Sequence, residues 1–122
     1  MIMRAKARSF QDLIVWQKSH HLTLHVYEAT ERFPRHELYG LTSQIRRAAA
    51  SVPSNIAEGF ARNSPGDALR FYKIADASLA ELKYQIILGL DLGYMTQETY
   101  ALLEQRAEEV GRLMHGWISS QA

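Results

Sequence analysis

Residues 37–62 read ELYGLTSQIRRAAASVPSNIAEGFAR, and the rest of the chain is expected to pack around them. An apolar line steps through this stretch by three or four residues, which is the spacing of one helix face. Its members are Leu38, Leu41, Ile45, Ala48 and Val52. A polar line with the same spacing comprises Gln44, Arg47, Ser51, Asn55, Glu58 and Arg62. The stretch therefore predicts a long helix that packs through one face and offers hydrogen-bonding groups on another.

Pro53 lies inside this predicted helix. A proline at such a position removes the hydrogen bond to the carbonyl four residues earlier, at Ala49, and costs about 3 kcal/mol. Residues 48–51 have little side-chain bulk, so another helix could approach closely there. Two interpretations stay open: a kinked helix of the core, or a kink that turns Asn55 and Glu58 toward a partner or ligand.

The composition is typical of one ordinary domain. The 122 residues are 47% hydrophobic and 22% charged, with a net charge of +1 and no cysteine, which excludes disulfide and thiol chemistry. No apolar run has the length of a signal peptide or a membrane span. We therefore expect a cytoplasmic protein with no membrane partner.

The charge is unevenly distributed along the chain. Residues 1–8 contain three basic side chains and no acid, and residues 32–62 contain five arginines against two glutamates. The remaining segments are net acidic. Any electropositive surface is therefore expected to come from the first residues and from the helix around Pro53.

Residues 1–9 are predicted to be a disordered basic leader, which includes Arg4. A helix should follow over residues 11–32, with Asp12 as its cap or first-turn acid, and Phe33 with Pro34 should end it. Two apolar lines share this helix, more than one bundle seam needs, which points to self-association. They are Leu13, Trp16, His20, Leu24 and Tyr27, and Val15, Leu22, Val26, Ala29 and Phe33.

Three histidines in this helix raise the question of a metal site. His21 and His25 are four residues apart, but the segment HLTLH lacks the glutamate of a zinc-protease motif, and the chain has no Glu-x-x-His pair. We expect surface or partly buried histidines, no metal and no cofactor.

Two further helices are predicted, over residues 65–92 and 97–119. Ser64 is expected to cap the first of them, with Pro65 at its first position and Asp67 in its first turn. Gly93 should end that helix in a left-handed conformation, and Thr96 should cap the next.

The pattern on these helices predicts how they pack. Gly89 inside the longer helix suggests close packing. The last helix repeats a clean seam of Tyr100, Leu103, Ala107, Val110, Met114 and Trp117. Helices of matched length with short links predict an all-α, antiparallel up-down-up-down four-helix bundle over residues 10–119, with residues 120–122 as a tail.

Several segments resemble a known family. They are residues 10–18 (FQDLIVWQK), 33–34 (FP), 37–42 (ELYGLT), 44–48 (QIRRA), 51–59 (SVPSNIAEG), 74–75 (IA) and 78–82 (SLAEL). Together they resemble the bacterial four-helix bundle proteins encoded in intervening sequences of 23S ribosomal RNA genes, over about residues 10–95. The resemblance implies a homopentameric ring. It extends to the accessory variability determinant proteins of diversity-generating retroelements, basic pentameric barrels that bind nucleic acid and a reverse transcriptase. This chain differs from them in its nearly balanced charge.

Two functions remain open. In the first, an oligomer binds RNA or DNA phosphates through Arg46, Arg47 and Arg62, with Lys18 and the leader as auxiliaries. Against this, Arg47 and Arg62 could simply pair with Glu58 and other acids within the bundle. In the second, the chain is a scaffold that binds a protein partner without nucleic acid.

Catalysis has little support in the sequence. Gln44, Ser51, Asn55 and Glu58 form a candidate polar cluster, with Ser54 nearby. However, no histidine or lysine base is placed beside a serine by spacing, so no catalytic residue is predicted.

Overall fold

Four α-helices make up most of residues 6–121, the part of the chain that this computed structural model describes. They are α1 (Ile14–Thr30), α2 (Leu41–Phe60), α3 (Pro65–Asp91) and α4 (Gln97–Ser119), with short 3-10 helices at η1 (Phe10–Asp12) and η2 (Arg35–Glu37). No strand occurs in that range, so the all-α prediction with four helices is confirmed. Residues 1–5 of the predicted leader, Arg4 among them, and residue 122 of the predicted tail lie outside the described residues. The predicted division into leader, bundle and tail therefore stays a prediction.

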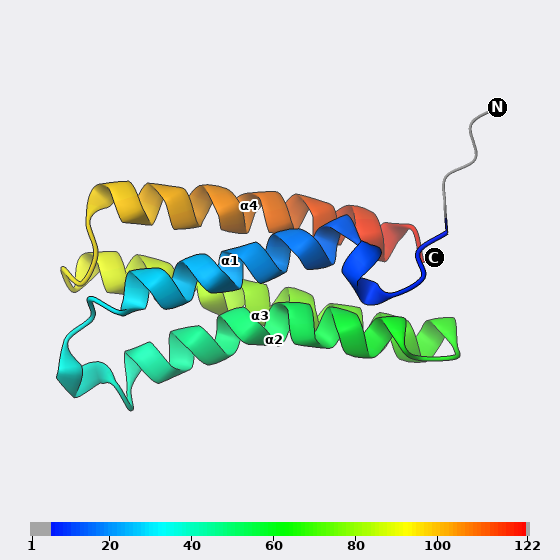
Figure 1. Cartoon of the computed structure of the whole chain (residues 1–122), viewed down its shortest axis with the longest axis horizontal. Coiled ribbons are helices and arrows are strands. Elements are labelled where there is room, and N and C mark those ends of the chain that lie inside the picture. The colour runs from blue at the N-terminus through cyan, green and yellow to red at the C-terminus, as the bar shows by residue number, and fades with distance from the viewer. Residues whose placement is uncertain (1–5, 122) are drawn as a thin grey trace.

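The helices lie side by side along the long axis of the molecule (Figure 1). Helix α1 packs against α2 and α4, and α3 packs against the same two, with the most extensive contact between α2 and α3. Each helix thus has two neighbours and a shared core between them. Within residues 6–121, no helix is both long enough and apolar enough to cross a membrane.

Much of the core is formed by the apolar lines that periodicity predicted, but Leu24 and Tyr27 of one α1 line are 53% and 44% exposed. The largest fully buried side chains include Leu22, Val26, Ile45, Val52, Ile56, Leu79, Leu82, Ile86, Leu103, Val110 and Met114. One predicted member of the α2 line is also wrong: Leu38 lies before α2 and is 48% exposed. The side chain of Glu37 caps α2 at Leu41, so the residues between them belong to a turn and not to the packed helix face.

The helix ends mostly follow the predicted signals. Ser64 and Thr96 accept hydrogen bonds from the backbone N–H groups of Asp67 and Thr99, at 3.2 and 3.1 Å. Gly93 has a φ of 78°, the left-handed conformation that glycine adopts freely. Helix α4 has the predicted bounds of residues 97–119.

The start of α1 differs from the prediction. Asp12 does not cap α1, because residues 10–12 form the separate 3-10 helix η1. The Asp12 carboxylate instead accepts the backbone N–H of Arg8 at 2.8 Å and that of Ser9 at 3.3 Å. Helix α1 therefore begins at Ile14, and it ends at Thr30, two residues before the predicted end.

Pro53 is accommodated inside α2 by a side chain of α1. The one O–H of Thr23 is shared between two carbonyls, that of Ala49 at 3.0 Å and that of Ser19 in its own helix at 2.9 Å. The Ala49 carbonyl is the one that Pro53 leaves without its helical donor. Thr23 is buried, so this hydrogen bond is shielded from water. The proline thereby becomes part of the contact between α1 and α2.

Glycines mark two places where elements approach closely. A Cβ atom on Gly59 would lie 2.5 Å from Cε1 of Tyr72, so a side chain there would push α2 away from α3. A Cβ on Gly89 would lie 2.9 Å from Cε of Met95 and 3.2 Å from Cζ of Phe33. The prediction of close packing at Gly89 is confirmed.

Candidate nucleic-acid interface

The candidate polar cluster is only partly brought together. Ser51 and Ser78 share a hydrogen bond between their hydroxyl oxygens at 2.8 Å, which ties α2 to α3. The side-chain amide of Asn55 donates to the Ser51 carbonyl at 2.8 Å and to its hydroxyl at 2.9 Å. Gln44 is exposed and lies apart from this group, and Glu58 binds Arg62. This arrangement stabilises the contact between two helices and leaves Asn55 turned toward its own helix.

Arg46 belongs to α2, and its half-buried side chain reaches toward α1. Its Nε–H group donates to Oγ1 of Thr30 at 2.8 Å, and the guanidinium carbon lies 4.8 Å from the centre of the Tyr27 ring. An arginine stacked on a tyrosine gains a cation–π attraction. Since an arginine has five N–H donors, these contacts leave part of the guanidinium available.

The other three predicted basic residues occupy different places. Arg47 is exposed and forms no ion pair within residues 6–121. Arg62 forms an ion pair with Glu58 at 2.9 Å, and Lys18 approaches Glu109 of α4 at 3.7 Å. Thus Arg62 pairs with Glu58 within the bundle, as the alternative reading of the sequence expected, whereas Arg47 does not.

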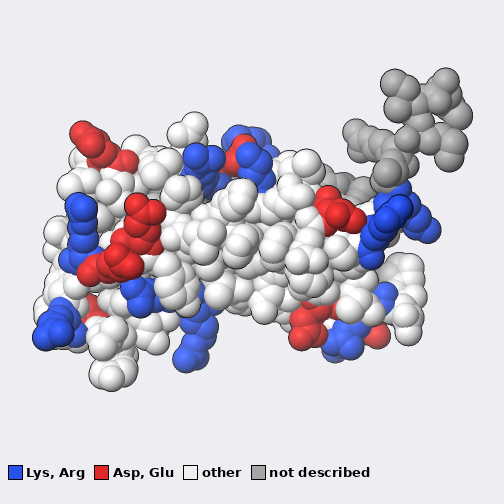
Figure 2. Space-filling view, in the orientation of Figure 1, with Lys and Arg blue, Asp and Glu red and all other residues white. Residues whose placement is uncertain are grey.

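These basic residues do not form a single patch. Arg62 follows Arg46 and Arg47 by about four helical turns, or roughly 24 Å along the axis at 1.5 Å per residue. Lys18 faces α4 rather than α2. On the face in Figure 2, acidic and basic side chains are interspersed and leave a broad uncharged area between them. Only Arg46 and Arg47 lie together.

Arg46 and Arg47 line an open hollow at the start of α2. Its volume is about 380 Å³, and its other lining residues are Tyr27, Leu38, Tyr39, Thr42 and Ser43. No carboxylate lines it, so its formal charges are both positive. Tyr39 is 93% exposed, the highest value among the large apolar and aromatic side chains of residues 6–121. Sequence reasoning missed Tyr39, because periodicity gives no weight to a turn residue and Tyr39 precedes the arginine pair by seven positions.

The turn that carries Tyr39 is held by Glu37. One carboxylate oxygen, Oε1, accepts the backbone N–H of Leu41 at 3.1 Å, and the other accepts the hydroxyl of Tyr94 at 2.8 Å. The hydrogen bond from Leu41, followed by that from Tyr94, lowers the pKa of Glu37 below its usual value of 4.5. The same contact with Glu37 raises the pKa of the Tyr94 hydroxyl. A Cβ on Gly40 would lie 2.7 Å from Oε1, so the missing side chain at Gly40 makes room for this carboxylate.

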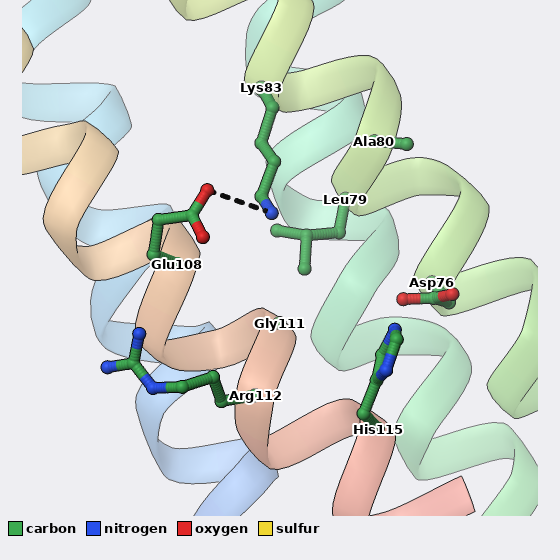
Figure 3. A pocket seen from close by; sticks show the side chains of 8 residues that line it. All are labelled: Asp76, Leu79, Ala80, Lys83, Glu108, Gly111, Arg112 and His115. Atoms are coloured by element: carbon green, nitrogen blue, oxygen red, sulfur yellow. Dashed lines mark ion pairs between the residues drawn. The ribbon is translucent and has the colours of Figure 1, made fainter.

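A larger hollow lies between α3 and α4 (Figure 3). Its volume is about 530 Å³, and Lys83 binds Glu108 across it at 3.2 Å. His115 of α4 and Asp76 of α3 face one another farther along. Acidic and basic side chains alternate around this hollow, so it offers no consistent charge to an anionic ligand.

The histidines of α1 lie on or near the surface, as expected. His20 stacks on Trp16 with ring centres 5.0 Å apart, His25 is half-buried and His21 is exposed. Among residues 6–121, no three His, Asp or Glu side chains converge on a point that could hold a metal ion.

Comparisons with known proteins found one matching family model and a similar solved structure. A family model described as 23S rRNA-intervening sequence protein matches residues 11–116. In fold, the chain is similar to a crystal structure from Bacteroides thetaiotaomicron VPI-5482, described as a protein with unknown function from the S23 ribosomal protein family. The TM-score is 0.77 at 23% sequence identity, over 86% of this chain and 98% of that one. No protein with a curated description matches the chain.

Proposed function

Because the chain belongs to the 23S rRNA-intervening sequence protein family, we propose that it is a non-enzymatic, cytoplasmic homo-oligomer that binds the phosphate backbone of RNA or DNA. The resemblance to pentameric relatives supplies the expected size, a ring of five antiparallel up-down-up-down bundles. The resemblance to accessory variability determinant proteins likewise implies a pentamer that binds nucleic acid.

The observation that carries the nucleic-acid role is the hollow at the start of α2. Arg46 and Arg47 line it with no carboxylate among the lining residues, and Arg47 has no ion pair in the described range that a phosphate would have to displace. A phosphate contact of this kind fixes position on a polynucleotide and reads little sequence. The proposed interface therefore consists of Arg47 with Arg46, without Arg62 or Lys18, which have carboxylate partners within the bundle.

The oligomer supports this role through avidity. Large apolar side chains stay exposed on α1 outside the hollow, with Ile14 at 57% and Leu24 at 53%. Exposed apolar surface of this extent favours burial against another copy. A ring would then present several arginine pairs at once, which raises the affinity of a weak single contact by effective concentration.

A salt titration of RNA binding tests the proposal. Affinity is expected to fall steeply as salt rises, because each phosphate that the protein contacts releases bound counterions. The substitution Arg47→Glu is expected to weaken binding strongly and to reduce the slope of log affinity against log salt, as measured by fluorescence anisotropy. Arg46→Glu is a weaker choice, since Arg46 also joins α2 to Thr30 of α1.

A matched control uses the same charge reversal elsewhere. Lys73→Glu changes an exposed residue of α3 that forms no ion pair among residues 6–121, and it should leave binding nearly unchanged. Equal loss in both variants would mean that net charge, and not this hollow, controls binding. Unchanged binding in Arg47→Glu would remove the arginine pair from the interface.

The alternative is a scaffold that binds a protein partner without nucleic acid. Exposed apolar side chains on α3 favour it, with Tyr84 at 61%, Ile87 at 45% and Ile74 at 44%. Co-purification of a defined protein partner, together with no salt-sensitive retention of RNA or DNA, would support the scaffold and exclude the nucleic-acid role.

A further inference from the structure

Tyr39 is exposed to a degree that packing does not explain. At 93% exposure, nearly the whole ring lies in water, and no other aromatic ring of the described residues stacks on it. Aromatic rings bury a large area when they gain a partner. The ring of Tyr39 therefore contributes little to the monomer and is available to a ligand.

The structure also holds Tyr39 in place on both sides. Glu37 binds the N–H of Leu41 and the hydroxyl of Tyr94, and Gly40 fits against the Glu37 carboxylate. The turn over residues 37–41 is thus fixed to α2 and to the link between α3 and α4. An exposed side chain on a fixed turn loses less freedom on binding than one on a loose loop.

The charged residues that line the hollow with Tyr39 are both arginines. Arg46 and Arg47 line the same hollow, which contains the second tyrosine, Tyr27, under the Arg46 guanidinium. Exposed aromatic rings beside a positively charged groove are the two components of single-stranded nucleic-acid binding, because bases stack on the rings while the backbone follows the charge.

From this juxtaposition we propose that the hollow binds an unpaired stretch of a polynucleotide, with a base stacked on Tyr39 and the adjoining phosphates on Arg47 and Arg46. This inference rests on the proposed function and names its ligand class: single-stranded, not duplex, nucleic acid. A duplex hides the faces of its bases within the stack, so it could use the arginines but not Tyr39. The larger hollow between α3 and α4 does not fit such a ligand, since Asp76 and Glu108 line it.

The test compares three labelled probes by fluorescence anisotropy. They are a single-stranded RNA of about 20 nucleotides, a DNA strand of the same sequence, and the corresponding RNA duplex. The wild-type protein is expected to bind the single strands more tightly than the duplex. Tyr39→Ala should weaken single-strand binding by about 5- to 150-fold, the range that corresponds to loss of one stacked base, and should leave duplex binding nearly unchanged.

Two variants serve as controls for the ring. Tyr39→Phe keeps the aromatic face and should bind single strands almost as the wild type does. Tyr84→Ala removes another exposed tyrosine, on α3, and should have no effect. Thermal unfolding should be the same for all variants, because neither tyrosine is packed in the core.

The negative results of this binding experiment can be told apart. If Tyr39→Ala and the wild type bind all three probes equally, the proposed function stands and the stacking site is wrong. If the wild type binds no probe at about 50 mM salt, the proposed function fails, and this inference fails with it. If Tyr39→Ala changes the mass of the oligomer, the ring of Tyr39 lies in a contact between proteins, which also overturns the inference. Tighter binding of either the RNA or the DNA strand than of the duplex, lost in Tyr39→Ala, supports the inference.

Discussion

The hydrogen bond from Thr23 to Ala49 explains how α2 keeps a proline in its interior. Proline removes a donor from the helix, and the buried carbonyl of Ala49 would otherwise be left without a partner. A buried acceptor without a partner costs about 1–3 kcal/mol. The proline and the threonine are therefore expected to act as a pair, although they lie on different helices.

Thr23→Val tests this pair, because valine has nearly the shape of threonine but no hydroxyl. We expect the free energy of unfolding, measured in urea, to fall by about 1–3 kcal/mol. In a Pro53→Ala background, the new N–H of residue 53 can donate to Ala49, so the same substitution should cost less. Equal costs in the two backgrounds would show that Thr23 and Pro53 are independent.

Glu37 gives the protein a predictable response to acid. Its pKa is lower in the folded state than its usual value of 4.5, so its contribution to stability is present above that value and is lost as the pH falls through the lowered pKa. Glu37→Gln should lose this contribution and show a flatter dependence of stability on pH below about 4.5.

Urea unfolding at several pH values measures this effect. Glu28→Gln is a suitable control, because Glu28 is exposed on α1 and its side chain accepts no hydrogen bond among residues 6–121. An identical acid profile in Glu37→Gln and the wild type would show that the bonds to Leu41 and Tyr94 do not persist in solution.

At the level of the helices, the sequence predicted the structure best where apolar side chains recur at helical spacing. The seam of α4 and the caps at Ser64, Thr96 and Gly93 were predicted correctly, because each depends on local spacing or on one residue type. The first residue of α2 was not predicted correctly. Glu37 caps that end at Leu41, and its carboxylate is also held by Tyr94, 57 positions away, a contact that no local pattern contains.

The candidate site was predicted less well for a related reason. Neighbours in a helix point in directions about 100° apart, so Arg46 turns toward α1 while Arg47 faces solvent. Spacing alone also grouped Arg47 with Arg62, although Arg47 lies near the start of α2 and Arg62 lies beyond its last residue. The sequence found the arginine pair but could not supply the turn that places Tyr39 beside it.

Gly59 provides a test of how tightly α2 and α3 pack, and an exposed glycine of α4 provides the control. Gly59→Ala should destabilise the fold by about 1–3 kcal/mol, since its methyl group would overlap the buried ring of Tyr72. Gly116→Ala, in α4, meets nothing within 4 Å and should stabilise the protein by about 1 kcal/mol through helix propensity. Thermal or urea unfolding measures both. A neutral Gly59→Ala would mean that the two helices separate easily.

For the whole molecule, the proposal predicts a particle much larger than one chain. Light scattering should report roughly 70 kDa for a pentamer of 13.9 kDa chains. Leu24→Glu places a charge on the exposed apolar face of α1 and should lower that mass without unfolding the helices, as monitored by circular dichroism. A wild-type protein that stays at 13.9 kDa at high concentration would contradict self-association.

The two ends of the elongated molecule carry different parts of the chain, which has a practical consequence. In Figure 1, the start of α1 and the end of α4 lie at one end of the molecule, and the link between α1 and α2, which contains Tyr39, lies at the other. A dye, affinity tag or surface tether attached at the start of α1 or at the end of α4 would stand about 25 Å from that link, which is the length of α1. Such attachments should leave the Tyr39 end facing the medium, so immobilised protein can be assayed without masking it.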